Sequence, residues 1–318
     1  MVPHEPQTER RISTTKYSLI NKTMKAIKYY ALMLIALVGM AACSSDDDDN
    51  TQKPIIDPVE GLSGYVFVSS RFFTNSYYGE AAKLTIKNEN DQWNVYFQDP
   101  QWGNGTFNNV SINAEQHTVT GTGSISMANL HSGEVKTYDA TISGDITNPT
   151  ITAELGTMGT TVISFFAGPA PEACQLGGSY TGVNSVKVGD TYGPYTADIT
   201  CKITPNPDGT LNVEIPEHLL NETAIGNLTL GKVTIKNLYY DEANKRFYKE
   251  YGKLDKDLTM HFKAEGTMNL DGDYAFTENS EMEVKATETG VQVINRYQLG
   301  KMPFPIVATF QGAIASEK

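Results

Sequence analysis

Residues 168–182, GPAPEACQLGGSYTG, decide how the chain is organised. Pro169 and Pro171 lack the main-chain N–H that a central strand donates to its neighbours, so this segment is not part of a sheet interior. Runs of alternating apolar and polar residues end before it and resume at Gly178. The pattern predicts a linker at residues 169–177 between two β-rich domains, residues 61–168 and residues 178–318.

The first half consists of short alternating stretches separated by Gly, Asn, Asp and Pro, which is typical of antiparallel strands. Only one segment in the whole chain, Glu217–Thr223, reads as a helix of a turn or two. The expected strands are Gly64–Ser69, Ala82–Lys87, Trp93–Gln98, Thr106–Asn113, Thr118–Met127, Lys136–Ser143, Thr150–Leu155 and Thr161–Phe166.

The second half repeats the order of the first. Trp93–Phe97 matches Leu211–Ile215, and Phe107–Asn113 matches Leu230–Lys236. Chance alternation in a β-rich chain is the alternative explanation. About eight up-and-down strands suffice to close a sheet into a small barrel, and closure removes the exposed edges. We therefore expect an all-β protein with two tandem antiparallel barrels of about eight strands each.

Three segments of the second half carry a family resemblance: Gly178–Gly182, Asp208–Val213 and Ile225–Leu230. They resemble the lipocalin-related, calycin-like β-barrel domain of Bacteroidetes lipoproteins. The likeness covers residues 178–318 and, more weakly, residues 61–168, where Asn90-Asp91-Gln92 stands in place of the Asp-Gly-Thr turn. The resemblance implies calycin-like barrels and brings no catalytic residues with it.

Residues 1–42 are predicted to be a signal peptide region. Lys25 and Lys28 precede an apolar run, Tyr29–Val38, that is shorter than the roughly 20 residues of a membrane span. Residues 1–23 are polar and basic, so Met24 is the simplest true start. An extended n-region is the alternative.

Cys43 directly follows Ala41 and Ala42. This arrangement resembles the lipobox of bacterial lipoproteins, which implies cleavage before Cys43 and acylation of its side chain. Acyl chains hold a protein on a membrane because each buried methylene contributes about 0.8 kcal/mol. An ordinary secretory signal with an incidental cysteine is the alternative.

The acidic run Asp46–Asp49 resembles the export signal of Bacteroidetes surface lipoproteins, which implies an outward-facing position on the outer membrane. A solvated spacer on a protein that faces the periplasm is the alternative. Because adjacent aspartates repel one another, residues 43–60 are expected to be a lipidated, disordered tether on either interpretation.

The charge balance argues against nucleic acid as a partner. The chain carries 25 Lys and Arg against 37 Asp and Glu. Removal of residues 1–42 takes away six basic and two acidic residues and leaves 19 against 35, a net charge of −16. Nucleic-acid affinity depends on basic residues that neutralise phosphates, and electrostatic binding to anionic lipid needs them as well.

No catalytic or metal-binding signature is present, so the sequence predicts a protein that is not an enzyme and has no cofactor. The five histidines lack metal-ligand spacing, and no nucleophile motif or phosphate-binding loop occurs. Asp271-Gly272-Asp273 offers a weak alternative as a cation site, and Glu281 with Glu283 offers one as a glycosidase pair. Whether Cys174 and Cys201 form a disulfide stays open.

Aromatic residues near loops provide the candidate ligand contacts, because such side chains stack on sugar rings or close over apolar ligands. Trp93, by its place in the repeat, is expected in the core. The leading hypothesis is a small hydrophobic or carbohydrate ligand in or at the mouth of a barrel. A structural or adhesive module with filled barrels is the alternative, and the oligomeric state is unknown. The candidate contacts are Tyr77, Tyr78, Trp102, Tyr240 and Tyr248.

Overall fold

A computed structural model describes residues 57–129, 132–265 and 270–315. The predicted signal peptide, the acylation site Cys43 and residues 43–56 of the predicted tether lie outside these ranges. Within them, no helix is both long and apolar enough to cross a membrane.

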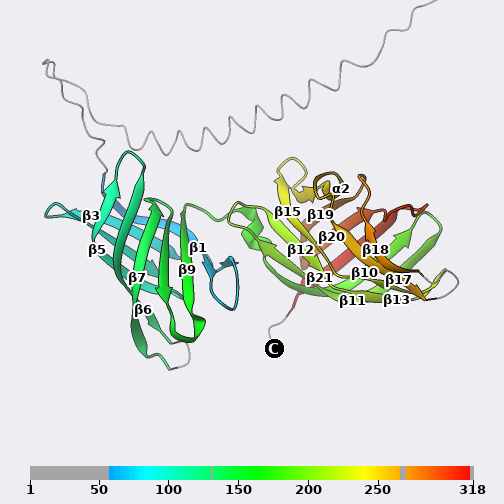
Figure 1. The fold of residues 1–318 in the computed structure, drawn as a ribbon, viewed down its shortest axis with the longest axis horizontal. Coiled ribbons are helices and arrows are strands. Elements are labelled where there is room, and N and C mark those ends of the chain that lie inside the picture. The colour runs from blue at the N-terminus through cyan, green and yellow to red at the C-terminus, as the bar shows by residue number, and fades with distance from the viewer. Residues whose placement is uncertain (1–56, 130–131, 266–269, 316–318) are drawn as a thin grey trace, which may run out of the picture. The chain divides into compact units, whose positions relative to one another are not determined.

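The first barrel is a closed antiparallel sheet of eight strands (Figure 1). It closes where the first strand pairs with the last, from Gly64 opposite Ala167 to Ser69 opposite Val162. All eight strands expected in this half are confirmed. They are β1 (Val59–Ser69), β3 (Ala82–Glu89), β4 (Gln92–Asp99), β5 (Gly103–Asn113), β6 (Thr118–Ala128), β7 (Val135–Asp145), β8 (Pro149–Glu154) and β9 (Thr160–Ala167).

Three short elements accompany this barrel. The strand β2 (Ser76–Tyr77) pairs with β1 just ahead of β3. A 3-10 turn, η1 (Gly156–Met158), joins β8 to β9. A second 3-10 turn, η2 (Glu172–Leu176), follows Pro171 in the predicted linker, where proline restricts the backbone.

The second barrel also closes with eight strands, so the expectation of an all-β chain with two antiparallel barrels of about eight strands each is confirmed. The matched segments occupy the same places in both copies, because β4 and β12 are third strands while β5 and β15 are fourth strands. The strands are β10 (Gly178–Val188), β11 (Tyr192–Pro205), β12 (Leu211–Ile215), β15 (Val233–Asp241), β16 (Arg246–Lys249), β19 (Glu281–Thr287), β20 (Gly290–Tyr297) and β21 (Ile306–Ile314).

The second barrel carries a four-stranded side sheet that the sequence did not predict. Two inserted hairpins form it, one between β12 and β15 and the other between β16 and β19. The second insertion begins with the short helix α2 (Tyr251–Leu254). The sheet consists of β13 (His218–Thr223), β14 (Gly226–Leu230), β17 (Thr259–Glu265) and β18 (Leu270–Ala275).

The predicted helix at Glu217–Thr223 is wrong, because this segment forms β13. Pro216 ends β12, and the chain then pairs with β14 from His218 opposite Leu230. Leu220 is fully buried against the barrel core. Ladder pairing and burial together outweigh the weak local preference for helix.

The interiors of both barrels are filled by their own side chains. A side chain with zero accessible surface borders no void that could hold a water molecule. In the first barrel these residues include Val66, Leu84, Val95, Phe97, Phe107, Ile125, Ile151, Ile163 and Phe165. In the second they include Val186, Cys201, Leu211, Val213, Ile235, Leu238, Tyr251, Met282 and Val284.

The two described cysteines are separate buried thiols. Cys201 lies in β11 opposite Tyr180, whereas Cys174 belongs to η2 and packs with Tyr65 and Phe67. Burial raises the pKa of each thiol to about 12, so neither is a reactive thiolate at neutral pH. The disulfide that the sequence left open is therefore not formed.

Candidate functional site

Tyr78 and Trp102, two of the predicted ligand contacts, lie together at one end of the first barrel. Their rings meet edge to face with centroids 4.9 Å apart, and Phe73 lies 5.7 Å from Tyr78 and 6.2 Å from Trp102. Trp102 is only 4% exposed. Tyr78 and Phe73 are half-buried, so they form the accessible part of this aromatic group.

The loop that carries Trp102 is held by Asp99. One carboxylate oxygen of Asp99, Oδ1, accepts the main-chain N–H of Gln101 at 2.8 Å and that of Trp102 at 2.7 Å. This geometry fixes the backbone of Trp102 and directs its indole into the protein. Among the described residues the buried indole Nε1–H has no hydrogen-bond partner.

Tyr77 does not join this group, although it precedes Tyr78 in the chain. It pairs opposite Phe67, and its ring centroid lies 5.7 Å from that of Phe67 and 6.5 Å from that of Tyr65. Tyr77 packs against a small hydrophobic cluster of the first barrel that also contains Cys174 of η2. Burial, together with the carboxylate of Glu80, raises the pKa of Tyr77 to about 12.

Tyr240 and Tyr248, the predicted contacts of the second barrel, belong to opposite faces of its wall. Tyr240 packs against Phe247 at 5.0 Å between ring centroids and lies against the barrel core. Tyr248 follows Phe247 in β16, and successive strand residues point to opposite sides. The structure therefore does not bring these two tyrosines into a shared site.

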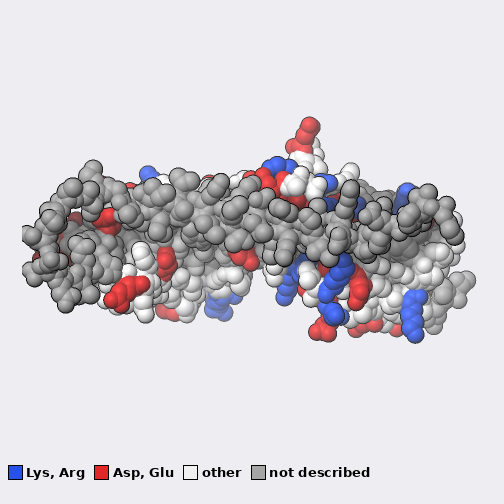
Figure 2. All heavy atoms as spheres, turned by 90° about the horizontal axis from the view of Figure 1, so that it is seen from above, with Lys and Arg blue, Asp and Glu red and all other residues white. Residues whose placement is uncertain are grey.

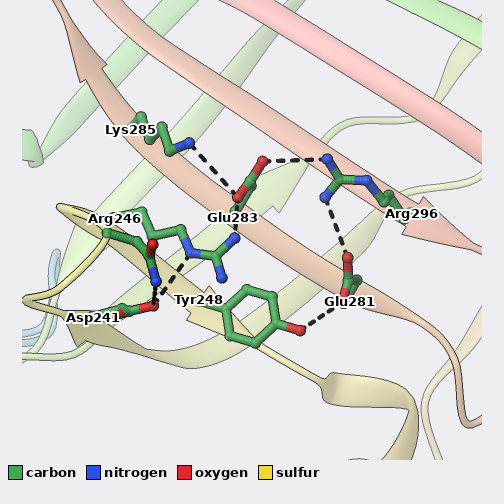
Figure 3. A network of polar contacts seen from close by, with 8 residues as sticks. Asp241, Arg246, Tyr248, Glu281, Glu283, Lys285 and Arg296 are labelled. Carbon is green, nitrogen blue, oxygen red and sulfur yellow. Dashed lines mark hydrogen bonds and ion pairs between the residues drawn. The ribbon is translucent and has the colours of Figure 1, made fainter.

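Tyr248 belongs instead to a network of charged side chains on the outer face of β15, β16, β19 and β20 (Figure 3). Its hydroxyl donates to Glu281, and the guanidinium of Arg246 lies 4.3 Å from its ring centroid. Arg296 bridges Glu281 at 3.2 Å and Glu283 at 3.3 Å. Arg246 also pairs with Asp241 at 3.4 Å and with Glu283.

This network argues against Glu281 and Glu283 as a glycosidase pair. Burial alone would raise the pKa of Glu283, but the hydrogen bond from Arg246 and the charges of Lys285 and Arg296 outweigh it and lower that pKa. A general acid for glycoside cleavage needs a raised pKa. The two carboxylates therefore stabilise the barrel wall through ion pairs.

The other weak alternative, a cation site at Asp271 and Asp273, does not assemble either. These aspartates lie on β18, and each contacts a different nitrogen of His261, at 3.2 Å to Nε2 and 3.0 Å to Nδ1. Within the part of the chain that the structure describes, no three potential metal ligands converge.

A groove of about 590 Å³ lies between β11 and β13 on the second barrel. One rim carries Thr196, Asp198 and Thr200, and the other carries Glu217, Leu219 and Asn221, all exposed. Ala197, Ile199 and His218 alternate with the rim residues and are less exposed, so they form the floor. Sequence reasoning missed this groove because it assigned one of its walls to a helix.

Two hydrogen bonds hold His218, at the floor of the groove, in one neutral tautomer. Its Nδ1 lies 2.9 Å from the carbonyl oxygen of Pro216, and its Nε2 lies 3.0 Å from the side-chain amide of Asn184. Nδ1–H therefore donates to Pro216, while Nε2 accepts from Asn184. Burial lowers the pKa of His218, and the hydrogen bond to Pro216 opposes that shift only in part.

Charged side chains of both signs are interspersed where they are visible on the face drawn in Figure 2.

Comparisons with known proteins agree with the fold. Residues 176–313 match the model of the calycin-like beta-barrel domain family. A crystal structure from Bacteroides fragilis, of a protein provisionally named as an outer membrane protein, aligns with a TM-score of 0.53 and 21% identity, over 79% of this chain and 96% of that chain. Because the aligned share exceeds the length of either barrel, the similarity of fold extends to both.

A second solved structure, a Nostoc punctiforme protein of unknown function, covers 80% of this chain and 94% of its own at 10% identity. Its TM-score of 0.22 is too low to carry an argument. A comparison with curated proteins returned no match.

Proposed function

We propose that this protein, whose residues 176–313 form a calycin-like β-barrel domain, is a lipid-anchored protein of the bacterial cell envelope that binds its ligand at barrel surfaces. Among the described residues, the interior side chains with zero exposure border no water-sized void, unlike those of a barrel that carries its ligand inside. We therefore place the ligand at a barrel end or on a wall. The ligand class that best fits a surface site with partly accessible aromatic side chains is carbohydrate.

The anchor rests on Cys43 and the acidic run behind it, which support an outward-facing position on the outer membrane. The naming of the structural neighbour agrees with that location. We expect radiolabelled palmitate to be incorporated into the wild-type protein in its host and not into Cys43→Ala. Incorporation into Cys174→Ala should be unchanged, and labelling of Cys43→Ala would contradict the anchor.

The observation that carries the binding proposal is the indole of Trp102. Its buried Nε1–H has no acceptor among the described residues, which costs free energy, while Tyr78 and Phe73 provide an accessible aromatic surface beside it. In this proposal the Trp102 loop opens, a hydroxyl oxygen of the sugar accepts this N–H, and the sugar ring stacks on Tyr78. Aromatic rings commonly combine apolar contact with one polar group in such sites.

The chain has two tryptophans, which allows a specific test. In the Trp93→Phe variant all tryptophan emission comes from Trp102. We expect neutral oligosaccharides to shift that emission, and Tyr78→Ala to weaken the shift. In Trp102→Phe the emission of Trp93 should stay constant during the same titration.

The second candidate function is a structural or adhesive module with filled barrels, and it is favoured by the zero exposure of the interior side chains. It predicts no change in Trp102 emission with any oligosaccharide. It also predicts that native mass spectrometry of protein taken from its host finds the bare polypeptide with its acyl chains. A co-purified small molecule would favour ligand binding instead.

A further inference from the structure

The groove between β11 and β13 on the second barrel has two free strand edges. β11 pairs with β10 along its length, but on its other edge only Lys202–Pro205 pair, with β12. In the part of the chain that the structure describes, β13 pairs only with β14. Across the described residues, no main-chain hydrogen bond joins β11 at 195–201 to β13. Unpaired N–H and C=O groups therefore line the groove on both sides.

Contacts at both ends of the groove and beneath it tie β11 and β13 to their surroundings. At one end, β11 and β12 pair from Lys202 opposite Glu214. At the other end, the hydroxyl of Tyr195 accepts the main-chain N–H of Ala224 at 3.0 Å. Between these two ends of the groove, the side chain of Asn184 in β10 hydrogen-bonds to His218. These contacts hold β11 and β13 near each other without a ladder between them.

Each rim of the groove carries one acidic side chain that has no basic partner among the described residues. Asp198 stands on the β11 rim and Glu217 on the β13 rim. Neither forms an ion pair or a side-chain hydrogen bond within the described part of the chain, and no Lys or Arg lines the groove. Two unpaired carboxylates across one groove favour a ligand with positive charges.

We propose that this groove binds an extended peptide segment of a partner protein that carries Lys or Arg side chains. The main chain of the peptide hydrogen-bonds to the free edge of β11 or β13, and its basic side chains pair with Asp198 and Glu217. A second copy of this acidic chain is disfavoured, because like charges would meet. An oligosaccharide is disfavoured as well, since no Trp, Tyr or Phe is among the residues that line the groove.

The test uses the whole mature chain and a fluorescein-labelled nine-residue peptide in which lysine alternates with valine. We expect the peptide to bind, and the double variant Asp198→Asn, Glu217→Gln to weaken binding at least about tenfold as measured by fluorescence anisotropy. The control is Asp257→Asn, Glu288→Gln, which removes the same charge from exposed positions outside the groove. It should change the dissociation constant less than about twofold.

Two further peptides separate charge from strand pairing. A peptide with glutamate in place of lysine should not bind. A lysine peptide with alternate N-methylated amides should bind much more weakly, because it cannot complete a ladder with a strand edge. Equal binding by the methylated peptide, equal loss in both double variants, or no binding of the lysine peptide would each overturn the proposal.

A neutral hexasaccharide is the remaining comparison. If it binds and loses affinity in the groove variant while the lysine peptide does not bind, the groove is a glycan site and the peptide proposal is wrong. This proposal and that for Trp102 concern different barrels and fail separately. Trp102→Phe should leave peptide binding unchanged, and the groove variant should leave the oligosaccharide response of Trp102 unchanged.

Discussion

Glu283 is the residue on which the charged network of the second barrel depends. Its side chain is 6% exposed and contacts Arg246, Arg296 and Lys285. We expect Glu283→Gln to lower the free energy of unfolding at pH 7 by about 2 kcal/mol, because it leaves partly buried guanidinium groups without their partner. Urea unfolding measures the change. Glu288→Gln, on an exposed turn, is the matched control.

The same residue predicts a pH dependence. The pKa of Glu283 is lowered in the folded protein from an ordinary value of 4.5. Its contribution is therefore complete above pH 4.5 and is lost as the pH falls through the native pKa. The difference in stability between wild type and Glu283→Gln should be smaller at pH 3.5 than at pH 7. An undiminished difference at pH 3.5 would contradict the assigned ion pairs.

His218 predicts a dependence at higher pH. Its pKa is lowered from 6.5, mainly by burial, so below pH 6.5 the unfolded chain binds a proton that the native chain does not. Stability should fall as the pH drops from 6.5 towards the native pKa. Between pH 7.5 and pH 5 the melting temperature of wild type should decrease more than that of His218→Gln. Equal decreases would show that His218 is not responsible.

Among the elements, the first strand of each barrel uses a glycine where it closes against the last strand. A β-carbon at Gly64 would lie 2.1 Å from the carbonyl oxygen of Phe166, and one at Gly182 would lie 2.0 Å from that of Gln311. Glycine at a bent strand often marks such a close approach of two backbones. The two halves of the chain, which are similar in sequence, therefore also close their barrels in the same way, with a glycine of the first strand against the backbone of the last.

Gly182→Ala should therefore destabilise the second barrel by about 3 kcal/mol, since the contact is with a main-chain atom that cannot move alone. Gly272→Ala in β18 is the control, because the nearest atom to its new β-carbon would be 3.7 Å away, in the side chain of Tyr274. Thermal unfolding followed by circular dichroism distinguishes the two. A small effect of Gly182→Ala would mean that the closure adjusts at little cost.

For the whole molecule, we predict that the chain contains two folding units separated by the linker. The core cluster of the second barrel draws all its buried members from Ala173 to Phe310. A fragment of residues 170–318 should therefore give a β-type circular dichroism spectrum and a cooperative thermal transition. A disordered fragment would show that the domain boundary proposed from the linker does not separate independent folding units.

The strand count and the order of strands could be predicted from the sequence because alternation is a local property. Every predicted strand of the first half is present, and the turn residues mark where each one ends. The side sheet could not be predicted in the same way. Pro216 and Gly231 interrupt long strands so that each continues in a second sheet, and only pairing with distant β17 reveals it.

The candidate contacts show the same limit. Tyr77 and Tyr78 are neighbours in sequence but belong to different clusters, and Tyr240 and Tyr248 fall on opposite faces of the wall. An alternating pattern predicts that a strand has two different faces, but it does not predict which side chains of other strands each face contacts. The groove forms because residues 195–201 of β11 have no partner on their second edge among the described residues, which is a property of the closed sheet and of no single segment.

The amino-acid sequence alone thus determined an all-β chain with two similar halves, a proline-rich link between them and an acidic overall charge, since each follows from composition and near-neighbour pattern. The tertiary structure alone decided that the barrels are filled, which aromatic side chains meet, and that β11 and β13 leave their edges free. Packing and strand pairing join residues far apart in the chain, and their outcome depends on all the strands closing together.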